Sequence, residues 1–168
     1  MKCLSLQQPY AWLIVQRAYE DNPGKPIKNV ENRHWPLPKT FTVPQRIYVH
    51  ASLTMYDVSL QEIRGQMGAM QWLRQRDALH SMYSLWETYK SRRDELKKFR
   101  YFGHILGEVD ITGCEFRFPD ENAELYSPWA IPGQYGFTLA NPQLYATPIP
   151  YKGQLGFFPV DLPIGTNR

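Results

Sequence analysis

The chain has 168 residues, of which 43% are hydrophobic, and its formal net charge is +3. This length and composition predict one domain over residues 1–168 with its own hydrophobic core. The two cysteines are far apart in the sequence and no apolar run reaches the length of a membrane span, which argues against a disulfide framework, a zinc site and a transmembrane protein. Because a secretory leader pattern is also absent, we expect a soluble cytoplasmic protein without a membrane partner.

The N-terminal segment predicts a strand followed by a short helix. Residues 3–6 alternate weakly between apolar and polar, and residues 10–18 place apolar side chains at helical spacing, so that Leu13 would be buried. Gln8 and Tyr10 stand where the helix starts. We expect these two residues to face a pocket.

The next segment, residues 28–35, concentrates chemically active side chains between Pro26 and Pro36, which rules out the interior of a long helix. As a strand it would place two sets of residues on opposite faces: Lys28, Val30, Asn32 and His34 on one, and Asn29, Glu31, Arg33 and Trp35 on the other. The second set offers an acid, a planar base and a stacking ring. The alternative is a solvated Glu31–Arg33 pair, with Trp35 covering the core.

A strand over residues 46–51 is followed by a segment with helical periodicity. Residues 56–101 predict two or three helices, with Ser59 and Glu62 spaced as a capping box, so that a helical insertion covers about residues 53–102. Eight Lys/Arg and four Asp/Glu lie between Arg74 and Arg100, a surplus of four positive charges in a chain of +3. These positive charges would serve either to attract a polyanion or simply to keep a surface helix well solvated.

The remaining chain predicts further strands. Residues 105–111 form one, and Gly107 within it indicates a bulge or a close approach by another group. The segment 125–139 carries Ser127 and Trp129 and ends in a strand, and residues 152–158 alternate in a way that would close a barrel. Together these elements predict an α+β fold.

Several common motifs are absent from the sequence. It carries no GxxxxGK[ST], GxGxxG, HExxH or GxSxG pattern. We therefore expect no nucleotide cofactor and no metal.

In their order along the chain, a set of short segments resembles the ASCH domain of the PUA-like superfamily. The matching residues are Leu4–Leu6, Gln8–Ala11, Leu13–Val15, Val30–Arg33 with Trp35, His50–Ser52, Gly107–Val109, Ser127–Pro128 and Lys152–Gly153. The resemblance covers both ends and the middle of the chain and leaves out the helical insertion. It implies a small PUA-like β-barrel with flanking helices and a cleft that faces the first helix and the motif strand.

The same resemblance implies function as well as fold. Members of the superfamily bind RNA or other nucleic acid, and some bacterial ASCH proteins are hydrolases, either N4-acetylcytidine amidohydrolases or ribonucleases. The amidohydrolase type uses a lysine, a threonine three residues later and a more distant glutamate. Lys28 matches the lysine, but Glu31 stands at the threonine position and lacks its hydroxyl nucleophile. The distant acid would be Glu121 or Glu124.

The first functional hypothesis is a module that binds RNA or a modified nucleoside. A base would stack on Trp35, Tyr10 or Trp129, and Lys28 or Arg33 would hold phosphate. Four further residues are expected to contact the edges of the base or the bound nucleic-acid strand: Gln8, Asn32, His50 and Ser127.

The second hypothesis is a metal-independent hydrolase. Lys28 and Glu31 would transfer protons, while Arg33 or Ser127 would stabilise an oxyanion. Ribonuclease chemistry through His50 or His34 is a further alternative, although a lone histidine at the end of a strand is commonly structural. The remaining hypothesis is that a protein partner docks on the helical insertion.

Overall fold

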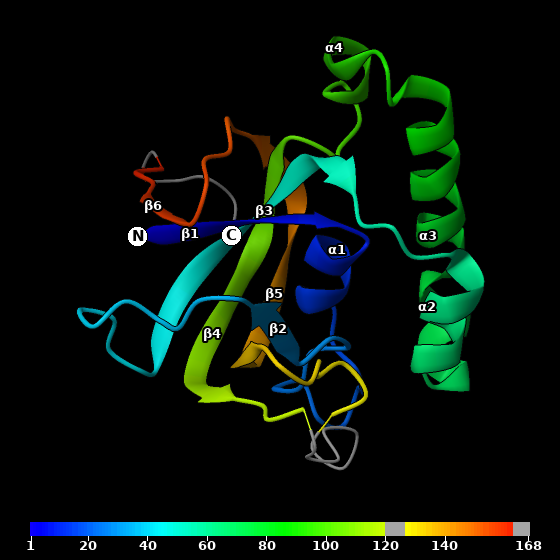
Figure 1. Ribbon diagram of the computed structural model, residues 1–168. Helices are drawn as coiled ribbons and strands as arrows, with labels where there is room; N and C mark the ends of the chain where they lie inside the picture. Colours follow the sequence, from blue (N-terminus) through cyan, green and yellow to red (C-terminus); the bar gives the residue numbers. More distant parts are fainter. Residues whose placement is uncertain (120–126, 163–168) are drawn as a thin grey trace.

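The computed structural model describes residues 1–119 and 127–162 and has an α+β architecture (Figure 1). Its elements, in chain order, are β1 (Lys2–Gln8), α1 (Tyr10–Ile14), β2 (Val30–Arg33), β3 (Gln45–Met55), α2 (Leu60–Gln66), α3 (Ala69–Tyr89), α4 (Arg93–Leu96), β4 (His104–Phe116), β5 (Tyr135–Pro150) and β6 (Phe157–Pro159). The predicted α+β class is confirmed.

The strands form one six-stranded mixed sheet in the order β2-β5-β4-β3-β1-β6. β1 pairs in parallel with β3, and the other neighbours are antiparallel. β6, which belongs to the tail expected to close a barrel, pairs with β1, so β6 and β2 occupy opposite edges of the sheet. Among the described residues the sheet is therefore open.

Gly107 marks an irregularity in the centre of the sheet, as its position in a strand predicted. The register shifts beside it in both pairings, between Val49 and His50 on β3 and between Ile105 and Gly107 on β4. A Cβ atom at position 107 would overlap the carbonyl oxygen of Gln143 on β5. The missing side chain is what lets the two backbones approach at this bulge.

α1 is shorter than the predicted helix over residues 10–18, because the chain after Ile14 pairs with a later segment instead. Ala18 N donates to Lys25 O at 2.8 Å, and Ile27 N donates to Gln16 O at 2.9 Å. The predicted burial is confirmed, since Leu13 is fully buried in the core.

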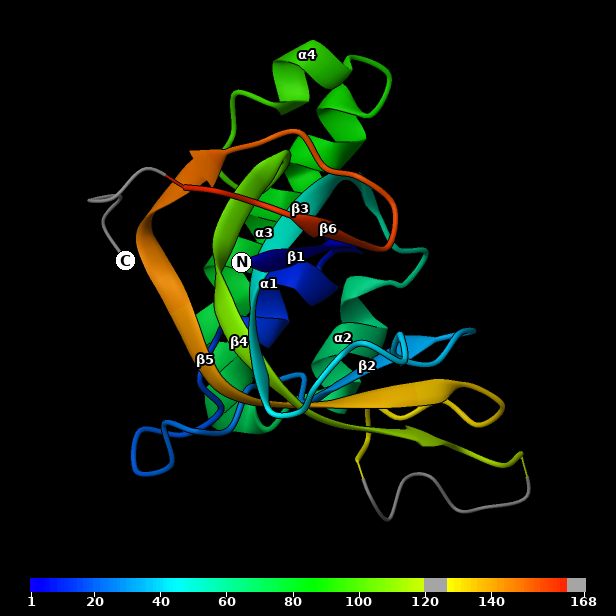
Figure 2. The same ribbon diagram turned by 90° about the vertical axis from the view of Figure 1, so that its left-hand side faces the viewer.

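The helices α2, α3 and α4 form the expected insertion between β3 and β4. Figures 1 and 2 show α2 and α3 along one flank of the molecule, with α1 between them and the sheet. Trp12 on α1 donates its Nε1 hydrogen to Gln75 Oε1 on α3 at 2.8 Å, which joins the two layers. The predicted capping box is present, because Glu62 N donates to Ser59 Oγ at 3.2 Å and Ser59 N donates to Glu62 Oε2 at 2.8 Å.

Within residues 1–119 and 127–162, no helix is both long enough and apolar enough to cross a membrane.

The glycine at the bulge gives a stability prediction. Gly107→Ala should lower the free energy of unfolding by about 1–3 kcal/mol, because the added methyl group forces β4 and β5 apart. Gly65→Ala is the matched control: it lies in α2 with no heavy atom within 4 Å of the added Cβ, and alanine favours a helix over glycine by up to about 1 kcal/mol. Urea denaturation of the three proteins would show both effects; equal stability of Gly107→Ala and the parent chain would contradict the account of the bulge.

Candidate functional site

A cavity of about 470 Å³ opens where six parts of the fold meet. Its walls come from β1, the first residue of α1, the segment around β2, the end of β3 with Tyr56, the segment before β5 and the loop between β5 and β6. Among its lining residues are Ser5, Gln7, Tyr10, Lys28, Glu31, Asn32, Arg33, His34, Trp35, Ser52, Thr54, Tyr56, Gln134, Gln154 and Leu155. Its volume falls within the range of roughly 300–1,000 Å³ that is typical of small-molecule sites.

A chain of three charged side chains forms one wall of this cavity. Lys28 is only 2% exposed, and its Nζ donates to Glu31 Oε2 at 3.0 Å and also to the carbonyl oxygen of Val30. The other carboxylate oxygen, Oε1, lies 3.1 Å from Arg33 Nε. Arg33 Nη2 donates to the carbonyl oxygen of Ser5 on β1 at 3.2 Å. The carboxylate therefore bridges two cations, and the trio carries a net charge of +1.

Burial lowers the pKa of Lys28 below its ordinary value of 10.5. Arg33 acts in the same direction, whereas Glu31 favours the charged amine and opposes them. Burial, the largest of these effects, makes the ammonium form less favourable than in water. Proton release from Lys28 is thus easier than from an exposed lysine, which is what proton-transfer chemistry at this amine would need.

Aromatic rings line the cavity beside the charged trio. Lys28 Nζ lies 4.8 Å from the centroid of the Tyr10 ring, and the rings of Tyr10 and Tyr56 are 5.0 Å apart. Tyr56 is 42% exposed and follows the end of β3. Trp35 packs its edge against the core ring of Phe137, with centroids 5.5 Å apart. These rings offer apolar faces next to a charged wall.

The structure brings together seven of the residues singled out from the sequence, namely Tyr10, Lys28, Glu31, Asn32, Arg33, His34 and Trp35. The expected division of residues 28–35 between two faces is wrong for Lys28 and His34, which line the same cavity as Glu31 and Arg33. β2 contains only Val30–Arg33, so Lys28 and His34 lie outside the strand and do not follow its alternation. The long side chain of Lys28 reaches along the backbone to Glu31.

Gln8 does not line this cavity, contrary to expectation. It is fully buried, where its Nε2 donates to Tyr101 O at 2.6 Å and its Oε1 accepts from Trp12 N at 3.0 Å. The amide thus joins the turn before α1 to the end of the helical insertion.

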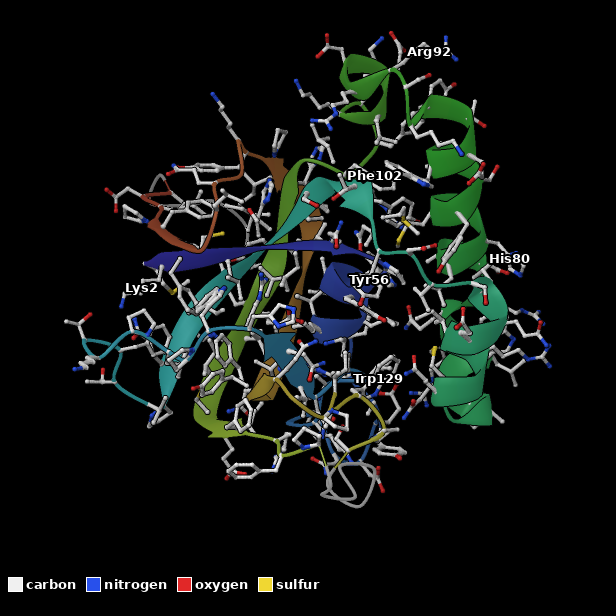
Figure 3. All side chains as sticks on the ribbon, in the orientation of Figure 1. Lys2, Tyr56, His80, Arg92, Phe102 and Trp129 are labelled. Atoms are coloured by element: carbon white, nitrogen blue, oxygen red, sulfur yellow. The ribbon has the colours of Figure 1, made fainter. Side chains whose placement is uncertain are left out.

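Ser127 and Trp129 also lie outside the cavity, and they hold its wall from behind. Ser127 Oγ donates to Asn29 Oδ1 at 2.7 Å, and Trp129 is 5% exposed with its ring edge toward Tyr10 at 6.4 Å. Asn32 lines the cavity, but its side-chain amide donates to Trp129 O at 2.8 Å and accepts from Ile131 N at 2.9 Å. Figure 3 labels Trp129 and Tyr56 on the side of the sheet that faces α2.

His50 lines a second, neighbouring cavity and is 2% exposed. Its Nε2 lies 3.0 Å from Tyr151 O, and because a carbonyl only accepts, Nε2 carries the proton and Nδ1 accepts from Ser5 Oγ at 2.9 Å. Burial lowers the pKa of His50, which favours this neutral ring. His34 lines the first cavity, so the structure assigns the two histidines to different cavities.

Several cavity residues were not identified from the sequence: Ser5, Gln7, Ser52, Thr54, Tyr56, Gln134 and Gln154. Alternation would have found the pair Ser5 and Gln7, because they share one face of β1 while Leu4 and Leu6 are buried. Glu121 and Glu124, the acids implied by the family resemblance, lie outside the described residues.

The buried amine predicts a specific dependence of stability on pH. Unfolded Lys28 keeps its proton up to about pH 10.5, whereas the folded chain releases it earlier, so stability should rise with pH between the lowered pKa and 10.5 by up to about 1.4 kcal/mol per pH unit. Lys28→Met should lack this rise. Urea unfolding of both proteins from pH 7 to 10 measures it, and the comparison cancels shared contributions such as that of Cys3, whose pKa burial raises to about 12. If the free energies of unfolding of the two proteins change with pH in parallel, the lowered pKa of Lys28 is refuted.

Comparison with protein-family models finds no model that matches this chain, and a search of curated proteins finds no match.

Proposed function

We propose that the chain is an ASCH-type, PUA-like module that binds single-stranded RNA or a nucleoside in the cavity around Lys28, Glu31 and Arg33. The observation that carries the proposal is the meeting of aromatic faces and a positively charged trio in one cavity of about 470 Å³. The order of the sequence segments that resemble the ASCH family supports the same assignment, and with it a PUA-like barrel arrangement of the strands.

A nucleobase matches the two kinds of surface in the cavity. One of its flat faces would stack on the exposed ring of Tyr56, which itself contacts the Tyr10 ring at 5.0 Å, and stacking is worth roughly 1–3 kcal/mol per base. Its polar edge would meet Glu31, since a carboxylate accepts from an exocyclic amino group such as that of cytosine. Arg33 and the amide of Gln7 supply donors for carbonyl or phosphate oxygens.

Removal of one ring tests binding directly. Tyr56→Ala should weaken the affinity for cytidine, and for a cytidine-rich single-stranded RNA, by roughly 5–100-fold, because one stacking face is lost. Tyr19→Ala is the matched control, since Tyr19 is 47% exposed against 42% for Tyr56 and does not line this cavity. Isothermal titration calorimetry measures both. No binding by the unmodified chain, or equal losses in the two variants, would overturn the proposal.

A second function is favoured by one observation, the lowered pKa of the buried Lys28. A neutral Lys28 amine would take a proton from water as the water attacks the acetyl carbonyl of N4-acetylcytidine. Arg33 would stabilise the resulting oxyanion, and the Lys28 ammonium would return the proton to the departing N4 amine, giving acetate and cytidine. Glu31 would hold Lys28 in place.

The hydrolase reading has its own test. If it holds, incubation with N4-acetylcytidine should release acetate and cytidine, and the rate should rise with pH as Lys28 loses its proton. Lys28→Met should lower the rate by at least about 100-fold, the usual scale of general acid–base catalysis. Chromatographic separation of the two nucleosides follows the reaction. Binding of N4-acetylcytidine without any product would leave the binding function standing and exclude this enzyme activity.

A further inference from the structure

A second cavity of about 760 Å³ lies beside the first, and the two share part of their lining. Ser5, Ser52, Thr54, Gln154 and Leu155 contribute to both. The shared floor is the end of β3, where Ser52 Oγ and Thr54 Oγ1 are 2.8 Å apart. The two cavities therefore form one groove, which we call the β3 groove.

The second half of the β3 groove is lined by cations. Arg93 begins α4, Lys97 directly follows it, and Lys152 comes from the loop between β5 and β6. Among the described residues, no aspartate or glutamate lines this half. The acidic partner that the structure shows for these cations is Asp94 on α4 itself, which is exposed and pairs with Lys97 at 3.0 Å. An exposed pair of this kind is weak and can yield to a stronger anion.

α4 is held firmly at the end of the groove. Leu96 is fully buried, and Gly103 after α4 donates to Ala51 O on β3 at 2.7 Å and accepts from Tyr151 N at 3.0 Å. Figures 1 and 2 both place α4 at the end of the sheet where β3 and β5 finish and β4 begins. The backbone that carries Arg93 and Lys97 is thus held in place beside the β5–β6 loop and its Lys152.

Leu155 gives the groove an apolar contact between its two polar halves. Its side chain is fully exposed although it is apolar, and it lines both cavities. Along the groove a ligand meets aromatic rings, then Leu155 with the hydroxyls of β3, and then cations. A single-stranded polynucleotide presents matching features, because it carries flat apolar bases on a backbone of phosphates and sugar hydroxyls. An acidic peptide would meet the cations but lacks a base for the first cavity.

We infer that the ligand is a single strand of RNA that continues from the base in the first cavity, with its phosphates held by Arg93, Lys97 and Lys152. This inference rests on the proposed function and gives the helical insertion a role, since Arg93 on α4 and Lys97 just after it would supply two of the three phosphate contacts. A free nucleoside would occupy only the first cavity. The chain should therefore bind a strand more tightly than the nucleoside, and the difference should depend on salt.

The test compares two triple variants by fluorescence anisotropy with a labelled single-stranded cytidine decamer of RNA. Arg93→Ala with Lys97→Ala and Lys152→Ala removes the groove cations. Arg76→Ala with Lys90→Ala and Lys98→Ala is the matched control, because these exposed cations belong to the insertion but line neither cavity. Cytidine binding is measured in parallel by calorimetry, and thermal unfolding confirms that both variants fold.

The groove variant should bind the decamer at least 10-fold more weakly than the control, with cytidine binding unchanged. Its slope of log affinity against log salt should be shallower by about 2, since each phosphate contact on a single strand contributes about 0.7. If cytidine binds the unmodified chain but the two variants bind the decamer equally, the inference fails and the proposed function stands. If neither ligand binds, both fail. Competition by a glutamate decamer as strong as by RNA would identify a general anion surface and overturn the assignment to RNA.

Discussion

The site depends on one buried electrostatic arrangement, the carboxylate of Glu31 held between Lys28 and Arg33. Lys28 is almost completely removed from water, and an unpaired charge there would be strongly unfavourable. Glu31 and the backbone carbonyl of Val30 offset that cost, while Arg33 completes the pair on the solvent side and ties β2 to Ser5 on β1. The trio therefore joins two distant strands of the sheet and leaves a net positive wall at the mouth of the cavity.

The fold places this arrangement where a ligand can reach it. Among the described residues β2 is an edge strand paired with β5, and its Glu31 and Arg33 line the cavity. Gln8, Ser127 and Trp129 hold the surrounding turns through bonds and ring contacts behind the cavity wall. The insertion packs against α1 through Trp12 and Gln75 and carries α4 to the far end of the β3 groove. Residues far apart in the chain thus meet along one continuous surface.

Much of this organisation follows from local sequence patterns. The strands, the insertion, the capping box of Ser59 and the bulge at Gly107 are each encoded in local patterns, and most residues of the polar segment 28–35 line the cavity. What the pattern did not reveal depends on partners distant in sequence. Gln8 is buried because its amide reaches the carbonyl oxygen of Tyr101, and Ser127 is occupied by Asn29. Likewise, the sequence alone does not show that the end of β3 and the β5–β6 loop line the same groove, because this depends on the order of the strands in the sheet.

The central claim is that a base lies against Tyr10 and Tyr56 beside the charged trio. The most direct measurement is the nuclear Overhauser effect between cytidine and the isotope-labelled protein. The account predicts contacts from the H5 and H6 protons of the base to the ring protons of both tyrosines. Contacts confined to the outer face of α3, where Figure 3 shows His80, or no contacts at saturating cytidine, would contradict it.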